Sequence, residues 1–422
     1  MLISVDHHHR WITALKYGCY PKGTRIGTQH VRDHTVARST PIGCPIQHAC
    51  NVRNITLHDK RSTHTHTRTR THTRTLTLTC ILAHAHSLLR SNETGDDLTA
   101  ADYYADSYGH HGIHEEMLKD EVRTRTYMNA ILHNGHIFKD KIVLDVGCGT
   151  GILSLFASKA GAKHVYGIDM SAIADSAKQI VRDNGYSDRV TIIKGKVEEV
   201  ELPEGGVDII ISEWMGYFLL YESMLDTVIY ARDKWLKPGG LIFPDKCTLW
   251  AVAIEDAEYR HDKIDWWSNV YGFNMDCIGR TALSEPLVDV VDPNQVCSNK
   301  ALIATFDIKK MKKEDAAFDS SFQIPILRKD FVHGLVVFFD VFFGDCHKSI
   351  GFSTSPKHKA THWKQTVLYL PDVLTVNPGD SIDCHMTCAP NDKNPRDLDI
   401  ALQYALSNAE GQWKAEHHYK LR

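Results

Sequence analysis

The middle of the chain alternates short apolar runs with segments in which apolar residues recur every three to four positions. Five of the apolar runs have the character of strands: residues 141–146, 164–168, 190–193, 207–211 and 241–243. Helical segments separate the early ones, and helical spacing begins at Leu98, with Tyr104 and Tyr108 four positions apart. This rhythm of strand, helix and strand predicts a parallel sheet covered by helices on both faces.

After residue 244 the pattern changes to strands. The clearest are residues 248–254, 302–308, 334–343 and 366–370, which predict an antiparallel sandwich or barrel. Residues 259–278 add a short insertion that contains Trp266, Trp267, Tyr271 and Phe273. These aromatic residues form either part of the core or an apolar arm that seeks a partner subunit. The sequence therefore predicts an α/β domain at 96–244, N-terminal helices included, followed by a β domain at 245–422.

Residues 1–95 do not have the pattern of a folded domain. At 63–79 threonine alternates with His, Arg or Leu, and the positions between the threonines are mostly polar, so no face can be buried. Thr can be encoded by ACA or ACG, and His, Arg and Leu by CAC, CGC and CTC. A slightly decayed CA dinucleotide repeat would therefore be translated into this alternating pattern. We hypothesise that much of this segment is a gene-model artefact, that is, non-coding sequence read as protein. The alternative is a disordered basic tail.

The net charge of -4 hides an uneven distribution. The first 90 residues carry 10 Arg and 3 Lys against 3 Asp, which leaves 35 basic and 49 acidic residues in the remainder. An acidic surface attracts basic partners and repels a phosphate backbone. Nucleic acid is therefore not expected to be a direct substrate.

Eleven cysteines are scattered through the chain without a Cys-x-x-Cys pair. The nearest approach to a metal pattern is Cys384 with Cys388, which we interpret as ordinary reduced thiols, so no metal site is expected. No window of 18 or more apolar residues occurs, and the first twenty residues lack the apolar stretch of a signal peptide. Neither a membrane span nor secretion is expected.

A glycine-rich turn follows the first predicted strand. Residues 143–153 place Gly147, Gly149 and Gly151 between this strand and its helix, where a backbone can approach a ligand closely. Asp145 within the turn disfavours a pyrophosphate and favours a cationic ligand such as S-adenosylmethionine.

Further acidic and basic residues surround this turn. Asp169, at the end of the second strand, is placed to hold ribose hydroxyls, although it could instead cap a helix. Val197 and Glu198 follow the third strand, where they could reach an adenine amino group. Arg123 could pair with the cofactor carboxylate, or form a surface ion pair with a neighbouring acid.

Residues 212–224 carry the most informative chemistry. Glu213 and Glu222 lie nine positions apart, after an apolar strand, and aromatic and glycine residues separate them. Such a loop can turn both carboxylates onto one cation. A guanidinium fits best, because its planar fork of donors matches carboxylates bidentately. The loop therefore predicts an arginine side chain as the substrate.

Together with residues 102–104, 112–120 and 361–365, the glycine turn and the double-glutamate loop closely resemble the type I protein arginine methyltransferases. The resemblance runs from about residue 102 to residue 422. It implies a class I S-adenosylmethionine-dependent methyltransferase domain of Rossmann-like fold, followed by an antiparallel β-barrel-like domain. It also implies that residues 259–278 are a helical dimerisation arm, which docks onto the cofactor-binding domain of the partner in a homodimer or higher oligomer.

The resemblance also implies roles for individual residues. The catalytic residues are Glu213 and Glu222, which grip the guanidinium, and His362 with Asp120, which help to dispose of the proton. The walls of the arginine pocket are Tyr104, Tyr108, Met117, Tyr217, Met224 and Trp363. The cofactor contacts are His114, Arg123, Asp145, Gly147, Gly149, Asp169, Val197, Glu198, Met117 and Tyr108. Met117 and Met224 would limit the product to asymmetric dimethylarginine.

The sequence departs from this family at a few positions. Asp169 stands where the family has Glu, and the shorter side chain predicts weaker cofactor binding. Met170 and residues 384–391 also differ. Three alternatives remain: a nicotinamide-dependent dehydrogenase, a small-molecule methyltransferase and a non-catalytic protein of the same fold. The dehydrogenase would leave the two glutamates unexplained.

The resemblance implies arginine-containing proteins as substrates, namely histone tails and Arg-Gly-rich RNA-binding proteins. It also implies a location in the nucleus and the cytoplasm.

Overall fold

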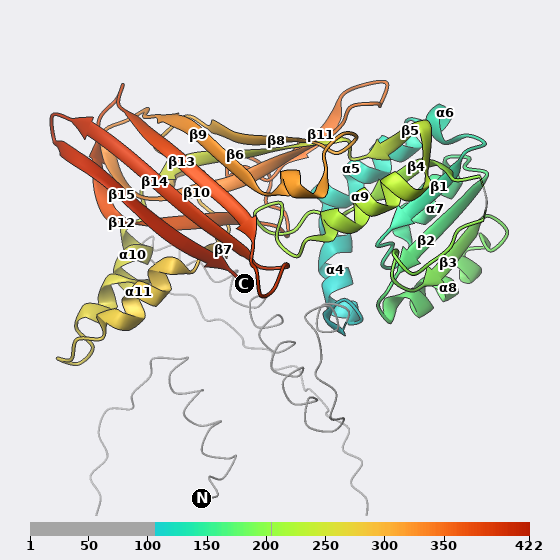
Figure 1. Ribbon diagram of the computed structural model, residues 1–422, viewed down its shortest axis with the longest axis horizontal. Helices are drawn as coiled ribbons and strands as arrows, with labels where there is room; N and C mark the ends of the chain where they lie inside the picture. Colours follow the sequence, from blue (N-terminus) through green and yellow to red (C-terminus); the bar gives the residue numbers. More distant parts are fainter. Residues whose placement is uncertain (1–105, 204) are drawn as a thin grey trace, which may run out of the picture. The chain divides into compact units, whose positions relative to one another are not determined.

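A computed structural model describes residues 106–203 and 205–422 (Figure 1). Outside the described residues lie the interpretations of residues 1–95, the first part of the helical segment expected from Leu98, and the predicted pocket residue Tyr104. Helices and strands carry the labels of Figure 1.

From residue 106 on, three helices precede the first sheet: α4 (His111–Lys119), α5 (Glu121–Leu132) and α6 (Gly135–Phe138). Asp120 separates the first two, and its side chain accepts a hydrogen bond from the backbone N–H of Arg123 at 3.1 Å. A short acidic residue at this position satisfies one of the donors that the first turn of a helix leaves without a partner. The cap fixes the start of α5, and α5 carries Arg123.

The predicted parallel sheet is confirmed. Its strand order is β3-β2-β1-β4-β5, with every neighbouring pair parallel. The strands are β1 (Ile142–Val146), β2 (His164–Asp169), β3 (Val190–Lys194), β4 (Val207–Ser212) and β5 (Leu236–Phe243). The connecting helices are α7 (Ile152–Lys159), α8 (Ile173–Asp183) and α9 (Met224–Trp235). The strand order reverses between β1 and β4, the point at which such sheets bind ligands beyond their carboxyl ends.

The second half contains two antiparallel sheets, as the pattern predicted. One has the order β7-β12-β10-β6-β8, with β11 paired to β10, and the other has the order β15-β14-β13-β9. The strands of the first are β6 (Lys246–Ile254), β7 (Leu287–Asp289), β8 (Ala301–Asp307), β10 (Asp330–Phe343), β11 (Ile350–Ser353) and β12 (Gln365–Val376). Those of the second are β9 (Phe318–Pro325), β13 (Ser381–Pro390), β14 (Leu398–Asn408) and β15 (Gly411–Leu421). Short 3-10 helices lie at Pro293–Gln295 and Lys313–Ala316.

Hydrogen bonds join both edge strands of the second sheet, β15 and β9, to strands of the first sheet. The hydroxyl of Tyr419 in β15 donates to the carbonyl oxygen of Tyr369 in β12 at 2.7 Å. The hydroxyl of Ser320 in β9 donates to the carbonyl oxygen of Ile303 in β8 at 2.6 Å. The result is barrel-like, with a core of inward-facing apolar residues such as Leu335, which is fully buried.

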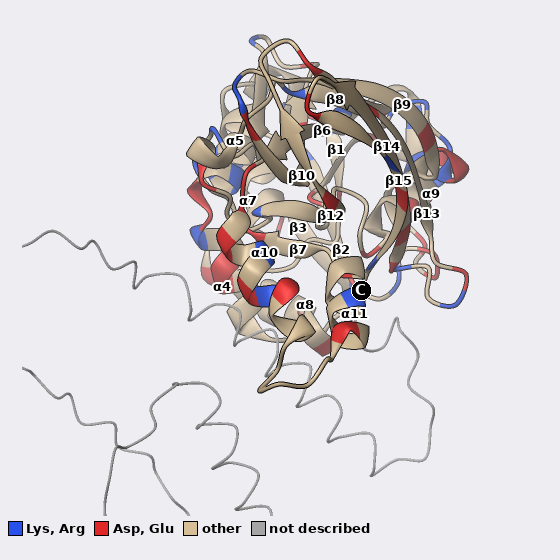
Figure 2. Cartoon of the chain, turned by 90° about the vertical axis from the view of Figure 1, so that its left-hand side faces the viewer, with Lys and Arg blue, Asp and Glu red and all other residues tan. Residues whose placement is uncertain are grey.

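The insertion between β6 and β7 forms an arm: α10 (Ala257–Lys263), a 3-10 helix (Asp265–Ser268) and α11 (Asp276–Ser284), which project from the barrel (Figure 1). Tyr271 is 88% exposed and Phe273 is 70% exposed, so these aromatic residues do not belong to the core. Charged residues of both signs surround them on α10 and α11 (Figure 2). Of the two interpretations of this segment, the structure supports the apolar arm.

Within the described residues, no helix is long and apolar enough to cross a membrane. The same part of the chain shows no group of three or more His, Cys, Asp or Glu side chains that could hold a metal ion. Cys384 and Cys388 are both buried in β13 as free thiols.

Candidate active site

A cavity of about 2140 Å³ lies at the carboxyl ends of β1, β2 and β4, and residues of the β domain complete its wall. Ten carboxylate side chains line it against six Lys and Arg side chains: Asp106, Glu115, Glu116, Asp169, Glu198, Glu213, Glu222, Asp262, Glu285 and Asp397, against Lys119, Arg123, Lys196, Lys263, Arg396 and Arg422. The excess of negative charge favours a cationic ligand.

The glycine turn lies at the cavity wall in a conformation that favours glycine. Gly147 has φ +70° and Gly149 has φ +53°. A Cβ at Gly147 would lie 2.6 Å from Cε of Met224, and one at Gly149 would lie 3.2 Å from Cε1 of His114. These positions therefore have no room for a side chain, and the glycine turn presents its backbone to the cavity as a cradle, directly before the start of α7.

The structure does not bring Asp145 to the cavity, contrary to the sequence prediction. Its side chain is fully buried beneath the turn, and Oδ2 accepts a hydrogen bond from the hydroxyl of Ser154 at 2.7 Å. Burial raises the pKa of Asp145 to about 7. Because β1 alternates its side chains between the two faces of the sheet, this residue points toward α7 rather than toward a ligand.

Asp169 does line the cavity, at the end of β2. Its Oδ2 accepts from the backbone N–H of Gly149 at 2.8 Å, and Oδ1 accepts from the N–H and the hydroxyl of Ser171 at 2.9 and 2.7 Å. It does not cap α8, which begins at Ile173. The helix-cap alternative is therefore wrong, and the carboxylate braces the glycine turn from the cavity side.

The other predicted cofactor residues lie around the same space. Val197 and Glu198 line it, and Glu198 accepts a hydrogen bond from the hydroxyl of Thr227 at 2.9 Å. His114 bonds to the carbonyl oxygen of Tyr108 at 2.7 Å, and burial lowers its pKa. A neutral imidazole is therefore favoured beside the glycine turn.

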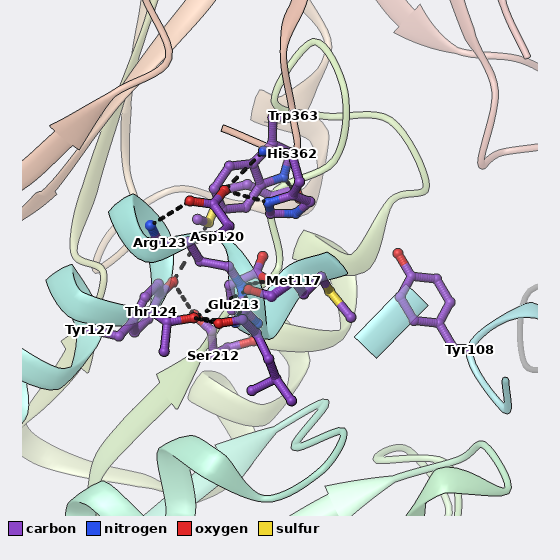
Figure 3. Close-up of polar contacts among 12 residues, drawn as sticks. Tyr108, Met117, Asp120, Arg123, Thr124, Tyr127, Ser212, Glu213, His362 and Trp363 are labelled. Atoms are coloured by element: carbon purple, nitrogen blue, oxygen red, sulfur yellow. Dashed lines mark hydrogen bonds and ion pairs between the residues drawn. The ribbon is translucent and has the colours of Figure 1, made fainter. Parts of the chain in front are cut away.

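Glu213 forms a buried ion pair with Arg123. The distance from Nε of Arg123 to Oε2 of Glu213 is 2.7 Å, and both side chains are less than 10% exposed. The guanidinium also donates to the carbonyl oxygen of Met117 at 3.3 Å. Figure 3 shows Arg123 and Glu213 close to Thr124 and Tyr127 of α5. The alternative of a surface ion pair between Arg123 and a neighbouring acid is wrong, because its partner is the buried side chain of Glu213. Arg123 lines the cavity, and its contact with the cofactor carboxylate stays a prediction.

Glu222 has different surroundings. The hydroxyl of Tyr108 donates to its Oε2 at 2.8 Å. Burial raises the pKa of Glu222 to about 7, although the Tyr108 hydrogen bond and the positive charge of Arg396 act in the opposite direction. Its backbone is left-handed, with φ +76°, and Ser223 follows with φ +56°. The second carboxylate therefore lies on a strained turn, in surroundings that favour its neutral form.

His362 and Asp120 form the expected pair. Nδ1 of His362 lies 2.8 Å from Oδ2 of Asp120, and the backbone N–H of His362 donates to the same oxygen at 2.9 Å (Figure 3). Burial acts to raise the pKa of Asp120, but the hydrogen bonds from His362 and Arg123 lower it overall. His362 lines the cavity, whereas Asp120 lies behind it. The neighbouring Trp363 donates from Nε1 to the carbonyl oxygen of Met215 at 2.6 Å, which ties the β domain to the double-glutamate loop.

The structure brings together most of the predicted pocket. Tyr108, Met117, Tyr217, Met224 and Trp363 all line the cavity. Sequence reasoning missed Arg396, which also lines it and contacts the backbone of Glu222. The surrounding Asn391, Asn394 and Pro395 are turn-forming residues and predict a loop, but nothing in the sequence connects that loop to Glu222.

Comparisons with known proteins place these features among relatives. The family model described as "Arginine methyltransferase oligomerization subdomain" matches residues 245–409, and "Methyltransferase domain" matches residues 143–240. The chain is 64% identical to Protein arginine N-methyltransferase 1 of Chlamydomonas reinhardtii, over 77% of this chain and 94% of that protein. It is 62% identical to the protein of the same name from Oryza sativa subsp. japonica, over 78% and 85%.

Solved structures of arginine methyltransferases are also similar to this chain. The structure titled "Trypanosoma brucei PRMT1 enzyme-prozyme heterotetrameric complex with AdoHcy" has a TM-score of 0.74 and 47% identity, over 75% of this chain and all of that chain. Protein arginine methyltransferase 10 of Arabidopsis thaliana has a TM-score of 0.67 and 30% identity, over 75% and 98%. The similarity covers both the methyltransferase domain and the β domain.

Proposed function

Because this chain belongs to the protein arginine N-methyltransferase family and transfers methyl groups from S-adenosylmethionine to arginine in proteins, we propose that it is a type I enzyme. Its products are then monomethylarginine and asymmetric dimethylarginine. The observation that carries the proposal is the pair of buried carboxylates, Glu213 and Glu222, on the wall of one acidic cavity that also contains a glycine cradle.

The residues of the cradle fit S-adenosylmethionine. The turn from Gly147 to Thr150 presents its backbone to the cavity, and Asp169 and Glu198 offer carboxylates to hydroxyl and amino groups. When bound, this cofactor supplies an electrophilic methyl group. A dehydrogenase would use a pyrophosphate-binding turn, and the carboxylate of Asp169 against Gly149 opposes a pyrophosphate there.

The two glutamates prepare the substrate guanidinium for attack. A free guanidinium has a pKa near 13.8, so its nitrogens are poor nucleophiles. Two carboxylates orient one terminal nitrogen and localise the positive charge on the other. They also offset the repulsion between the two cations, which is roughly 4 kcal/mol at 4 Å with an effective dielectric of 20.

The product keeps one positive charge, so a proton leaves the guanidinium. The sequence offered Glu213 or the His362 and Asp120 pair as acceptors. The structure supports a third, Glu222, because a general base works best when its pKa lies near the operating pH and Glu222 has a pKa of about 7. Glu213 is already paired with the guanidinium of Arg123, which suits it to orient the substrate.

The methionines support the asymmetric product. Met117 and Met224 both line the cavity, and Met224 lies against the glycine turn. In the second transfer, their bulk leaves little room for monomethylarginine to turn its unmethylated terminal nitrogen toward the methyl donor. Two methyl groups then accumulate on the same nitrogen.

The acidic cavity supports basic protein segments as substrates, and we propose Arg-Gly-rich RNA-binding proteins and histone tails. A location in the nucleus and the cytoplasm follows from these substrates. The oligomerisation family model and the exposed aromatic residues of the arm support an oligomer, which we propose to be a homodimer.

The test is radiolabelled methyl transfer to an Arg-Gly-rich peptide, followed by acid hydrolysis and identification of the methylarginines. We expect monomethylarginine first and asymmetric dimethylarginine later, and no label on a matched Lys-Gly peptide. Symmetric dimethylarginine as the end product would contradict the type I assignment. Absence of transfer, together with calorimetric binding of S-adenosylmethionine, would support the non-catalytic alternative.

A further inference from the structure

One loop of the β domain reaches the backbone of Glu222. The loop consists of residues 391–397, between β13 and β14. The backbone N–H of Glu222 donates to the carbonyl oxygen of Arg396 at 2.8 Å, and Nη1 of Arg396 donates to the carbonyl oxygen of Glu222 at 2.7 Å. The hydroxyl of the next residue, Ser223, donates to the carbonyl oxygen of Pro395. Three hydrogen bonds therefore hold two consecutive residues of the double-glutamate loop.

The 391–397 loop is itself well fixed. Oδ1 of Asn391 accepts from the N–H groups of Lys393 and Asn394 at 3.0 and 3.1 Å. Oδ1 of Asn394 accepts from the N–H of Arg396 at 3.3 Å, and its Nδ2 donates to Asp397 at 2.9 Å. Asparagine side chains that bond to the backbone in this way stabilise a tight turn. The loop can therefore act as a rigid support.

Glu222 needs such a support. Glu222 and Ser223 both have positive φ values, +76° and +56°, and neither is glycine. Residues with side chains avoid this region, and they stay in it when surrounding contacts determine the conformation. The contacts from the 391–397 loop are of that kind. Without them the turn would relax, and the carboxylate of Glu222 would move away from the guanidinium.

We propose that Arg396 is a positioning residue for methyl transfer: it fixes the backbone of Glu222, so that the β domain sets the direction of a carboxylate that the methyltransferase domain supplies. Arg396 acts through Glu222 rather than on the reacting atoms.

Its charge adds a second effect on the same carboxylate. Arg396 lowers the pKa of Glu222, against the burial that raises it to about 7. Removal of the charge would therefore raise this pKa, and a larger fraction of Glu222 would be protonated at neutral pH. A purely structural arginine would not change the pH dependence of turnover.

The experiment compares Arg396→Met and Arg396→Lys in the full chain, with Arg328→Met as the control. Arg328 also donates to backbone carbonyl oxygens, those of Val296 and Asn294, but it does not line the cavity. We expect Arg396→Met to lower kcat by about 100-fold, the effect of a misplaced group, while the Kd for S-adenosylhomocysteine changes by less than about twofold. The acid limb of the kcat/KM profile, where activity falls as the pH decreases, should move to higher pH.

Arg396→Lys should return the acid limb to the wild-type pH, because it restores the charge, and should recover part of kcat. The proposal is overturned if Arg396→Met has the same kcat and the same acid limb as the control variant Arg328→Met. It is also overturned if cofactor affinity falls as far as kcat, because the defect would then not be specific to Glu222.

A second variant covers the case in which Arg396→Met does not fold. Ser223→Ala removes the contact with Pro395 and leaves every charge in place. We expect kcat to fall by about tenfold with an unchanged acid limb. Wild-type kcat in Ser223→Ala would contradict the supporting role of the 391–397 loop.

Discussion

Glu213 and Glu222, the two carboxylates proposed to clamp the substrate guanidinium, lie on one loop, yet the protein holds them in opposite ways. Glu213 directly follows β4 and pairs with Arg123 of α5 at 2.7 Å, inside the methyltransferase domain. Glu222 lies on a left-handed turn, accepts a hydrogen bond from Tyr108, and takes its backbone support from the β domain. The first carboxylate has a cationic partner in direct contact, whereas the second has a hydrogen bond from Tyr108 and the weaker influence of the charge of Arg396.

The difference separates two tasks. A carboxylate with a buried cationic partner is held in place, so Glu213 is suited to orient the substrate. A buried carboxylate whose pKa is raised to about 7 changes its charge near neutral pH, so Glu222 is suited to bind a cation and to take its proton. The same contrast predicts that changes at the two positions have different effects on activity and on stability.

The largest expected effect is the loss of turnover in Glu222→Gln. The amide keeps the shape of the side chain but cannot balance the guanidinium charge or accept its proton. We expect kcat to fall by about 1000-fold, while calorimetry still detects cofactor binding. The control is Glu314→Gln on the surface, with activity unchanged. Near-normal turnover of Glu222→Gln would refute the clamp.

Glu213→Gln should also lose turnover, but it should lose stability as well. The change leaves the guanidinium of Arg123 buried without a charged partner, which costs about 3 kcal/mol of unfolding free energy. Denaturant unfolding of Glu213→Gln and Glu222→Gln side by side measures this. Equal stabilities would contradict the contrast between the two carboxylates.

The effect of pH on stability at Glu222 is expected to be opposite to that of an ion-paired carboxylate, whose pKa is lowered by folding. The pKa of Glu222 in the folded protein, about 7, lies above its unfolded value, so its contribution to stability is present below pH 4.5 and is lost as the pH rises to about 7. Glu222→Gln should therefore gain stability relative to the wild type between pH 5 and pH 8.

A smaller effect is expected at the second proton route. His362→Gln removes the partner of Asp120, and kcat should fall by about 10- to 100-fold if this pair helps to remove the proton. His358→Gln, an exposed histidine nearby, is the matched control. A kcat close to that of the control would assign proton removal to Glu222 alone.

The smallest effect concerns Tyr108. Turnover requires ionised Glu222, so kcat/KM should fall as the pH decreases through about 7. Tyr108→Phe removes a hydrogen bond that favours the ionised form, and the acid limb should move upward by less than one pH unit, with about a threefold loss at pH 7. A pH profile of both proteins decides this, and a downward shift would contradict the assignment of the limb to Glu222.

Much of the fold could be predicted from local pattern. The five parallel strands follow from short apolar runs separated by helical segments, and the observed β1 and β4 lie within one residue of the predicted limits. Glu213 and Glu222 could be predicted as a pair because they share one loop. In each case the information lies within about a dozen neighbouring residues.

The contacts that orient the clamp could not be predicted, because they join residues far apart in the chain. Arg123 precedes Glu213 by 90 positions, and Arg396 follows Glu222 by 174 positions. Asp145 was misassigned for a different reason. Its position in the motif suggested a ligand contact, whereas the alternation of side chains along β1 turns it toward Ser154.

The exposed aromatic residues of the arm have a consequence for the behaviour of the protein in dilute solution. Four apolar side chains of the arm are each at least 42% exposed: Trp266, Tyr271, Phe273 and Ile278. Covering them releases water from apolar surface, which favours association. The proposed association through this arm would obey mass action, so the fraction of paired protomers would rise with the amount of enzyme in the cell. Abundance would then set the thermal tolerance of the enzyme as well as its total activity.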